Sequence, residues 1–512
     1  RKSDVREVPS TAEPTSSGER SKTKWLKIGL ASFGAIVLIG LGMYLFIPKA
    51  ASIDSIAVLP FENVGADPNT EYLSDGITES LINTLSQLSN LSVMSRSSVF
   101  HYKGKDIDPQ MAGKELGVKA VLTGRVTQRG DNLQINTELV DVSKNTNIWG
   151  EQYNKRLSDI LAVQEEISKN ISQQLSLKLG SEDKRKLAKR FTENTEAYQL
   201  YLKGRFHWNK RTAVDLRKAV DYFNQAIEKD PGYALAFAGL ASTYALLPEY
   251  ASLPAKDFIP KTEAAARKAM ELDATLAEPH ATLALIKFEY QWNWDGAEKE
   301  FRRAIELNPN NPTTHHWYSN SLELQAKFEE ALAEIKRAQE LDPLSLVINV
   351  NVGEVFFYRR RYDLAIEQLN RTLELDPNFT VARVTLAQVY AQERKFDEAI
   401  AEVQKVRQIL GTNSPYGIGV LGYIYAKAGK KDQATKTLDH LLGLSKQGYA
   451  LSVDIAGVYA ALGQKDKAFE WLERGYNEQN SNLGYLKIDF EWDKLRSDSR
   501  YTALLKKIGL EK

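Results

Sequence analysis

Alanine recurs at a nearly constant interval along the C-terminal half of this chain, and a larger apolar side chain follows each of these alanines four positions later. A fixed period of roughly 34 residues predicts helical hairpins that stack side by side into one array. Such arrays bind other chains along a groove and seldom carry out chemistry. The alanines are Ala297, Ala331, Ala365, Ala399, Ala434 and Ala468.

The residue types at the repeat positions explain why hairpins are expected. A small side chain lets the second helix of a hairpin approach the first closely, and the next apolar residue, such as Phe301 or Ile335, fills the same face. Pro309, Pro343 and Pro377 follow three of these helices at the same interval as the alanines. Proline ends a helix because it lacks an amide hydrogen. The pattern therefore predicts both the helices and their turns.

The first helices of the repeats share a second pattern of large and small residues. It reads Leu240-Ala241-x-x-Tyr244 in one repeat and Leu386-Ala387-x-x-Tyr390 in another. Together with the alanine period, these residues closely resemble the tetratricopeptide repeat (TPR) family. The resemblance implies a mainly α protein built as an α-solenoid of helical hairpins. We expect about eight repeats over residues 191–476 and a C-terminal helical cap over residues 477–512.

Charge and cysteine content argue against a nucleic-acid partner, disulfides and cysteine-containing zinc sites. The net charge is +1, whereas a nucleic-acid-binding surface is usually strongly basic, so no nucleic-acid partner is expected. The chain has no cysteine, which excludes disulfides and the usual cysteine-containing zinc sites.

A stretch of twenty residues from Ile28 to Ile47 carries no charge. A helix of this length just spans a bilayer core, and four cations precede it: Arg20, Lys22, Lys24 and Lys27. The positive-inside rule then places the N-terminus in the cytoplasm. We predict a single-pass protein of the inner membrane with its later domains in the periplasm. A cleaved signal peptide is the alternative, although its apolar core would be shorter.

Residues 1–27 are rich in Ser, Thr, Pro, Glu and Lys and begin with Arg. This composition predicts a disordered cytoplasmic linker, and the missing Met leads us to expect an effector domain upstream of it. Ala31 and Ala35 have the small-xxx-small spacing that supports helix pairing, so a homodimer is an open alternative.

Residues 53–153 follow a different pattern, in which short apolar runs alternate with helical periods. Residues 118–128 and 133–142 are predicted strands, because Arg129-Gly-Asp-Asn132 between them is a good hairpin turn. We therefore predict a small α+β domain, followed by a connecting helix over residues 157–190.

Six segments of this domain carry a family pattern: Ile56-Ala-Val-Leu-Pro-Phe61, Tyr72-Leu-Ser-Asp-Gly-Ile-Thr-Glu79, Ser95-Arg-Ser-Ser98, Ala112-x-x-x-Leu-Gly-Val118, Val121-Leu-x-Gly124 and Leu139-Val-Asp141. They resemble the TolB amino-terminal-like (FlgO-like) family. In proteins of that architecture, a membrane helix, a TolB-like domain and TPRs follow a cytoplasmic effector. The effector is commonly a serine/threonine kinase, a nucleotide cyclase or a winged-helix DNA-binding domain.

Three features resemble catalytic or ligand-binding motifs. Gly417-Ile-Gly-Val-Leu-Gly422 matches a dinucleotide fingerprint but falls within a repeat's first helix, where Gly422 takes the small-residue position. His315 and His316 are adjacent, so on a helix they point about 100° apart. Asp75 and Glu79 lie one helical turn apart. Paired carboxylates of this kind act in acid–base catalysis, or they simply stabilise the N-terminus of the helix through its dipole. We expect no catalytic residue, no cofactor and no metal site.

The TPR resemblance implies that first helices line the concave face of the array. Asn320, Glu354 and Gln388 recur with the alanine period and should point into the groove. Polar and aromatic side chains at such periodic positions suit an extended peptide, although an ordinary solvated helix face fits as well. The full predicted set is His316, Asn320, Glu323, Glu354, Tyr358, Gln388 and Gln392.

Two classes of function fit these expectations. The first is the extracytoplasmic protein-interaction module of a bacterial membrane signalling receptor, with a protein or peptide ligand in the groove. The second is a structural scaffold for envelope assembly that has no signalling output. An in-frame kinase, cyclase or DNA-binding domain upstream would favour the first class.

Overall fold

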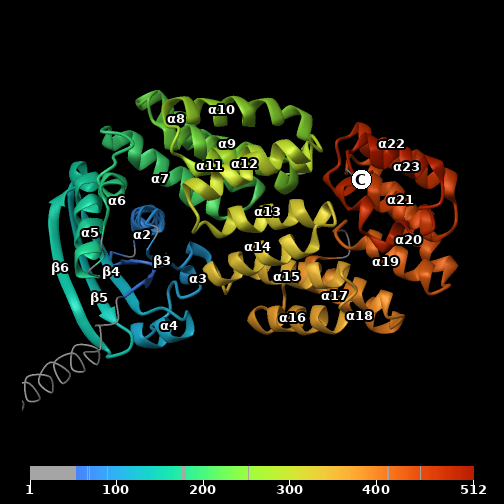
Figure 1. Ribbon diagram of the computed structural model, residues 1–512, viewed down its shortest axis with the longest axis horizontal. Helices are drawn as coiled ribbons and strands as arrows, with labels where there is room; N and C mark the ends of the chain where they lie inside the picture. Colours follow the sequence, from blue (N-terminus) through green and yellow to red (C-terminus); the bar gives the residue numbers. More distant parts are fainter. Residues whose placement is uncertain are drawn as a thin grey trace, which may run out of the picture. The chain divides into compact units, whose positions relative to one another are not determined.

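The computed structural model describes residues 53–511, apart from residues 66, 68, 69, 89, 176, 178, 252, 412, 413 and 450 (Figure 1). The predicted linker (1–27) and the predicted membrane helix (28–47) lie outside the described residues.

The predicted localisation requires a correction. In the described part of the chain, no helix is both long and apolar enough to cross a membrane. The longest of the repeat helices, α9 (Ala234–Ala251), has 18 residues and contains Pro248, and it buries most of its apolar side chains against neighbouring hairpins. The finding contradicts a single-pass inner-membrane protein with periplasmic domains, and we do not carry that prediction further.

The N-terminal domain contains one mixed sheet in the order β3-β1-β4-β5-β6, with β2 paired to β4. The β1–β3 and β1–β4 pairs are parallel, whereas β4–β5 and β5–β6 are antiparallel. The last three strands are long because a hairpin turn at Gly130 lets Arg129 pair with Asn132. The strands are β1 (Ser55–Val58), β2 (Glu62–Asn63), β3 (Ser92–Val93), β4 (Ala120–Arg129), β5 (Asn132–Asp141) and β6 (Thr146–Arg156).

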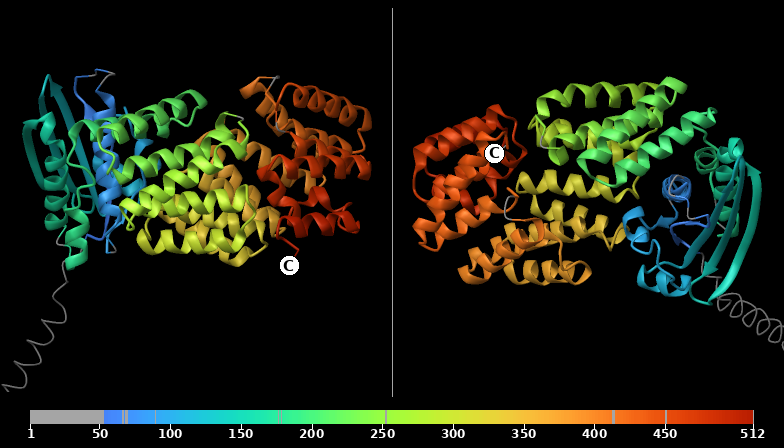
Figure 2. Two further views of the ribbon diagram at one scale, coloured as in Figure 1. Left: turned by 90° about the horizontal axis from the view of Figure 1, so that it is seen from above. Right: turned by 180° about the vertical axis from the view of Figure 1, so that it is seen from behind.

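Helices cover one face of this sheet, and α4 covers only part of the other. Phe61, which precedes β2, packs so closely on Gly124 that a Cβ there would lie 2.6 Å from its ring. On the opposite face, Gly113 of α4 lies against Val121. Helices α2 and α5 pack against each other beside the strands (Figure 2). The helices of this region are α2 (Glu71–Ser86), α3 (Arg96–Phe100), α4 (Pro109–Glu115), α5 (Ile160–Gln174) and α6 (Ser181–Leu187).

Sixteen described helices, α7 to α22, pair in order into eight hairpins. The first helices are α7 (Thr195–Asn209), α9, α11 (Ala277–Glu289), α13 (Pro312–Leu324), α15 (Leu346–Tyr358), α17 (Thr380–Gln392), α19 (Ile418–Lys427) and α21 (Ser452–Ala461). The second helices are α8 (Ala213–Lys229), α10 (Ile259–Leu272), α12 (Trp294–Leu307), α14 (Phe328–Leu341), α16 (Tyr362–Leu375), α18 (Phe396–Leu410), α20 (Lys431–Lys446) and α22 (Lys465–Asn477).

The packing of the hairpins follows the alanine period. Ala297, Ala331 and Ala365 have no exposed surface, and neither do Phe301 and Ile335 beside them. Each first helix contacts the next first helix, whereas each second helix packs between first helices. The first helices therefore form one continuous surface, which we call the inner face.

The turn between the two helices of a hairpin has one recurrent backbone conformation. Seven of the described turns contain a residue with φ between 49° and 83° at equivalent positions. This left-handed conformation is costly for any residue with a Cβ and easy for glycine. The residues are Arg211, Trp292, Ala326, Arg360, Arg394, Gly429 and Gly463.

Two Gly→Ala substitutions with opposite expected effects on stability test this explanation of the turn conformation. Gly429 has a φ of 78° and open space around it, so Gly429→Ala should destabilise the protein by roughly 1–2 kcal/mol through backbone strain alone. Gly443 lies inside α20, also in open space, and Gly443→Ala should stabilise it by about 1 kcal/mol through helix propensity. Urea unfolding of both variants measures the difference, and a shift of the same sign in both would contradict the account.

The C-terminal residues differ from a simple cap over the last hairpin. They form η3 (Ser481–Lys487), η4 (Phe490–Trp492) and α23 (Ser499–Lys507). α23 packs on α22, as a cap should, but η3 also contacts α11 and α13 of the inner face (Figures 1 and 2). We call Gln479 to Arg496 the return segment.

Candidate interaction surface

The structure places Asn320, Glu354 and Gln388 at the same position, the ninth residue of the 13-residue helices α13, α15 and α17. All three side chains are half-buried. The repeat period thus brings these residues onto one face of three neighbouring first helices.

Asn351 connects two of the predicted residues into a hydrogen-bonded chain. Its Oδ1 lies 2.6 Å from His316 Nε2, and its Nδ2 donates to Glu354 Oε2 at 2.5 Å. Thr385 Oγ1 donates to the other oxygen of Glu354 at 3.1 Å. Burial lowers the pKa of His316 to about 4, so the ring is neutral near pH 7. These bonds join α13, α15 and α17 through side chains of the inner face.

Asn320 lies at one end of that chain, with its Nδ2 3.5 Å from His316 Nε2, whereas Gln392 makes other contacts. Gln392 donates from Nε2 to Tyr423 OH at 3.2 Å and accepts a hydrogen bond from Lys427 Nζ. Gln388 lies one helical turn earlier on the same helix.

The return segment packs on Tyr358, and its Gly484 lies against Leu324, the residue after Glu323. The Tyr358 ring lies 6.0 Å from that of Tyr485 and 6.2 Å from that of Phe490. Glu323 is only 2% exposed, and its Oε1 has no hydrogen-bond partner in the described part of the chain. These two residues therefore do not line an open groove, because a segment distant in sequence packs on Tyr358 and the side chain of Glu323 is buried.

The inner face and the return segment together contain several carboxyl groups with raised pKa values. Burial raises the pKa of Asp454 and of Asp489 to about 6. Burial and then the charge of Glu249 raise the pKa of Glu289 to about 8. Burial likewise raises the pKa values of Glu323, Glu354 and Glu491.

The carboxyl of Glu289 predicts a pH dependence of stability. Its pKa is about 8 in the folded protein and near 4.5 ordinarily, so the folded state keeps a proton that the unfolded chain releases. The free energy of unfolding should therefore fall as pH rises from about 4.5 to about 8. Between pH 6 and pH 8 the fall in urea midpoint should be smaller in Glu289→Gln than in the wild type. Glu306→Gln, on the exposed side of α12, is the control and should follow the wild type.

A second polar cluster joins the α+β domain to the array. Arg205 of α7 donates from Nε to Glu79 Oε1 at 2.7 Å, and Arg96 Nε lies 3.1 Å from Glu79 Oε2. Asn209 donates to the same oxygen at 2.6 Å, and Arg205 also pairs with Glu278 at 3.0 Å. Burial by itself would raise the pKa of Glu79, but the two arginines outweigh it and lower the pKa. Glu79 is therefore a buried structural anion, which neither sequence-based interpretation of it anticipated.

Further contacts join α3 and the neighbouring loop to the ends of second helices. Asp342, directly after α14, accepts hydrogen bonds from Ser97 and from Ser98 Oγ, the latter at 2.6 Å. Asn310, after α12, donates to the carbonyl of Ser86 at 3.3 Å. The serines of the Ser95-Arg-Ser-Ser98 motif thus bind the array.

Removal of Glu79 should destabilise the protein strongly. Glu79→Ala leaves Arg96 and Arg205 buried without their shared anion, which should cost about 3–5 kcal/mol. Glu71→Ala removes only the half-exposed bridge to Lys103 and should cost less than about 1 kcal/mol. Urea unfolding measures both variants, and equal losses would contradict a central role for Glu79.

The motifs that suggested chemistry have structural explanations. A Cβ on Gly422 would lie 2.7 Å from Val458 Cγ2, so this glycine allows α19 and α21 to pack. His315 is buried, with Nδ1 2.6 Å from Glu334 and Nε2 3.0 Å from the carbonyl of Pro309. Among the described residues, no group of three His, Cys, Asp or Glu side chains is placed to hold a metal ion.

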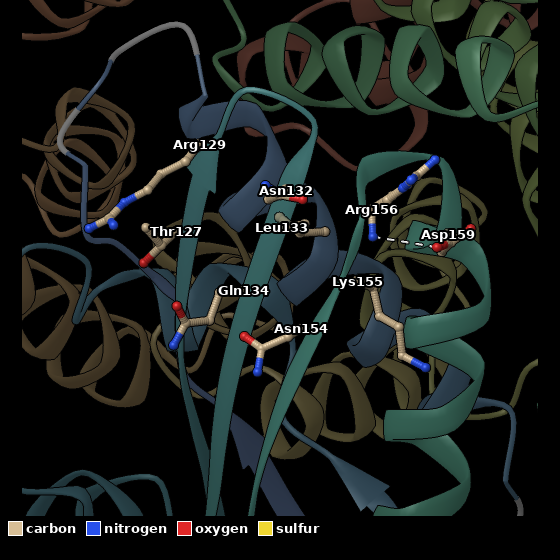
Figure 3. A pocket seen from close by; sticks show the side chains of 9 residues that line it. All are labelled: Thr127, Arg129, Asn132, Leu133, Gln134, Asn154, Lys155, Arg156 and Asp159. Carbon is tan, nitrogen blue, oxygen red and sulfur yellow. Dashed lines mark hydrogen bonds between the residues drawn. The ribbon is translucent and has the colours of Figure 1, made fainter.

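A shallow hollow of about 460 Å³ lies on the α+β domain, over β4 to β6 (Figure 3). Its lining is polar, and the contact drawn within it joins the backbone amide of Arg156 to Asp159 Oδ2 at 3.4 Å. The lining residues are Thr127, Arg129, Asn132, Leu133, Gln134, Asn154, Lys155, Arg156 and Asp159.

Family profiles match three parts of the chain. Residues 288–345 and 357–417 match tetratricopeptide repeat profiles. The chain carries a TPR array. Residues 51–170 match the second domain of HilA/YgeH-like transcriptional regulators. The α+β domain is therefore similar to that HilA-like domain, and the match does not support the finer TolB-like assignment.

One curated relative is the "Putative adenylate cyclase 3" of Rhizobium meliloti (strain 1021), which is 35% identical over 241 residues. The match covers 46% of this chain and 41% of the relative, so it spans less than half of that protein.

Solved TPR proteins resemble the chain more distantly. Pseudomonas aeruginosa pilF is 21% identical over 44% of this chain and 96% of its own, with a TM-score of 0.34. YrrB, titled "a TPR protein with an unusual peptide-binding site", is 20% identical over 41% of this chain and 97% of its own, with a TM-score of 0.27.

Proposed function

We propose that this chain is the partner-binding part of a bacterial signalling protein. Its TPR array would bind a segment of a protein partner on the inner face and pass the change in packing to the α+β domain. The observation that carries the proposal is the buried Glu79 cluster, because it ties the first hairpin of the array to α2 and α3.

The comparisons support the signalling context. A HilA-like regulator domain beside a TPR array, and a relative named as an adenylate cyclase, both belong to proteins that control a response. The adenylate cyclase activity in that name is assigned to the relative and not to this chain. A TPR array is a binding fold, so the described residues are proposed to sense and not to catalyse.

The chemistry of the inner face favours an extended protein segment. Half-buried amide and carboxyl groups recur on adjacent first helices, and they suit the main-chain and side-chain hydrogen bonds of a peptide. Asn320 Oδ1 is buried without a hydrogen-bond partner in the described part of the chain, which leaves one acceptor for a donor from the ligand.

Peptide display against the full purified chain tests the proposal. Selected peptides should bind the wild type at least about tenfold more tightly than the triple variant Asn320→Ala, Glu354→Ala, Gln388→Ala, because the variant lacks the polar groups of three adjacent repeats. Fluorescence anisotropy measures the affinities, and circular dichroism checks that the variant is folded.

A matched triple variant supplies the control. Glu306, Glu340 and Glu374 recur with the same period, but they are exposed on second helices, so their replacement by Ala should not change binding. Hydrogen exchange in α2 and α3 should change when a peptide binds the wild type. Equal binding to both triple variants would contradict the inner-face site, and unchanged exchange would favour a scaffold without signalling output.

A further inference from the structure

We propose that the return segment is an internal ligand of the inner face, which an extended segment of a partner displaces. The partner segment would carry two aromatic side chains at the spacing of Tyr485 and Phe490. This inference rests on the proposed function and names the kind of partner.

The return segment crosses the array and does not extend it. Gln479 Nε2 donates to the carbonyl of Tyr290, after α11, at 3.3 Å. Gly484 lies against Leu324 at the end of α13, where a Cβ would come within 2.8 Å of Cδ1. The segment consists of short 3-10 turns and loop, and η3 contacts two successive first helices, α11 and α13.

Two aromatic side chains anchor the segment on α15. The Phe490 ring lies 5.3 Å from that of Phe357, at an angle of 78°, and it also packs on Tyr358. Tyr485 packs on Tyr358 from the other part of the segment. Because edge-on and tilted aromatic pairs contribute specific geometry beyond burial, this pair of rings determines where the segment docks.

The docked position also contains unfavourable contacts. Glu323, the residue before the Leu324 that Gly484 contacts, is buried, and its Oε1 has no hydrogen-bond partner in the described part of the chain. Glu491 lies close enough to α21 that a Cβ on Gly457 would come within 2.6 Å of its carboxyl oxygen, and burial, Asp489 and Asp454 together raise its pKa. Unpaired buried carboxyl groups cost free energy. Docking is therefore weaker than its apolar contacts alone would make it, and a competing segment is able to replace it.

The connections at both ends keep the segment near the inner face when it leaves. Tyr476 stacks on Trp292 with ring centres 5.2 Å apart, and Trp294 Nε1 donates to the carbonyl of Ile508 at 2.7 Å. A tethered ligand has a high effective concentration, so the wild type should exclude weak competitors and admit only partners with matching anchors.

A synthetic peptide with the sequence of residues 479–496 tests the inference. Its binding to the full chain is measured by fluorescence anisotropy. Phe490→Ala weakens docking of the chain's own segment, so this variant should bind the peptide at least about tenfold more tightly than the wild type does. Adding Tyr358→Ala to that variant should abolish the gain, because it removes the surface that both peptide rings contact.

Tyr449→Ala is the matched control, since Tyr449 is an aromatic residue with 37% of its surface exposed. It should bind the peptide as weakly as the wild type. A folded Phe490→Ala variant with no gain in binding would overturn the inference and make the return segment a permanent part of the core.

A second variant keeps the test decisive if Phe490→Ala does not fold. Glu323→Gln removes the unpaired carboxyl without changing the size of the side chain, so docking should become tighter. At pH 8, where an exposed carboxyl is ionised, hydrogen exchange of the return segment should slow at least about threefold. Unchanged exchange would overturn the inference.

The two proposals fail separately. Peptide binding to Phe490→Ala, with no partner found by peptide display, would leave the internal ligand standing and contradict the proposed function. A displayed partner that binds the wild type without altering hydrogen exchange in the return segment would instead support the proposed function and contradict the internal ligand.

Discussion

The array depends on one close contact, the approach of an alanine in each second helix to the first helix of the same hairpin. Ala297, Ala331 and Ala365 have no exposed surface, so a larger side chain there would push the two helices apart. Because each hairpin packs mainly on its neighbours, such a change would shift every later hairpin. The inner face, the docking of the return segment and the interface with the α+β domain all depend on that spacing.

The array presents two surfaces with different physical characters. Towards the α+β domain, the buried charge of Glu79 is fully compensated by Arg96, Arg205 and Asn209, which favours one fixed arrangement. On the inner face, Glu323 is buried without compensation, which favours exchange between arrangements. A rigid interface beside an exchangeable one is suited to transmit the effect of binding.

Much of the fold follows from local patterns in the sequence. Alternating apolar residues and a Gly130 turn predict the β4–β5 hairpin, and the structure pairs Arg129 with Asn132. The alanine period predicts that Asn320, Glu354 and Gln388 occupy equivalent helical positions, as the structure shows. Whether they bind a ligand is a separate question, which the proposed experiments address.

Other parts of the site lay beyond local patterns. Asn351, which joins His316 to Glu354, is one position beyond the strict period from His316 and so falls outside it. The membrane prediction rested on an uncharged run and the cations before it, and in the described part of the chain no helix is long and apolar enough to cross a membrane. The C-terminal residues had the composition of a cap, but composition does not say which hairpins a cap will reach.

The sequence by itself determined the hairpins, their turns and the residues on each helix face, because these depend on neighbours a few positions away. Tertiary structure alone decided that Glu79 would meet Arg205, 126 residues later, and that Tyr485 and Phe490 would cover Tyr358. The first contact depends on how α2 packs against α7, whereas the second depends on the curvature that small rotations between hairpins accumulate along the array. No repeat pattern in the sequence encodes these tertiary contacts. The residues that pair with the buried charges, and those that pack on the inner face, are therefore known only from the folded chain.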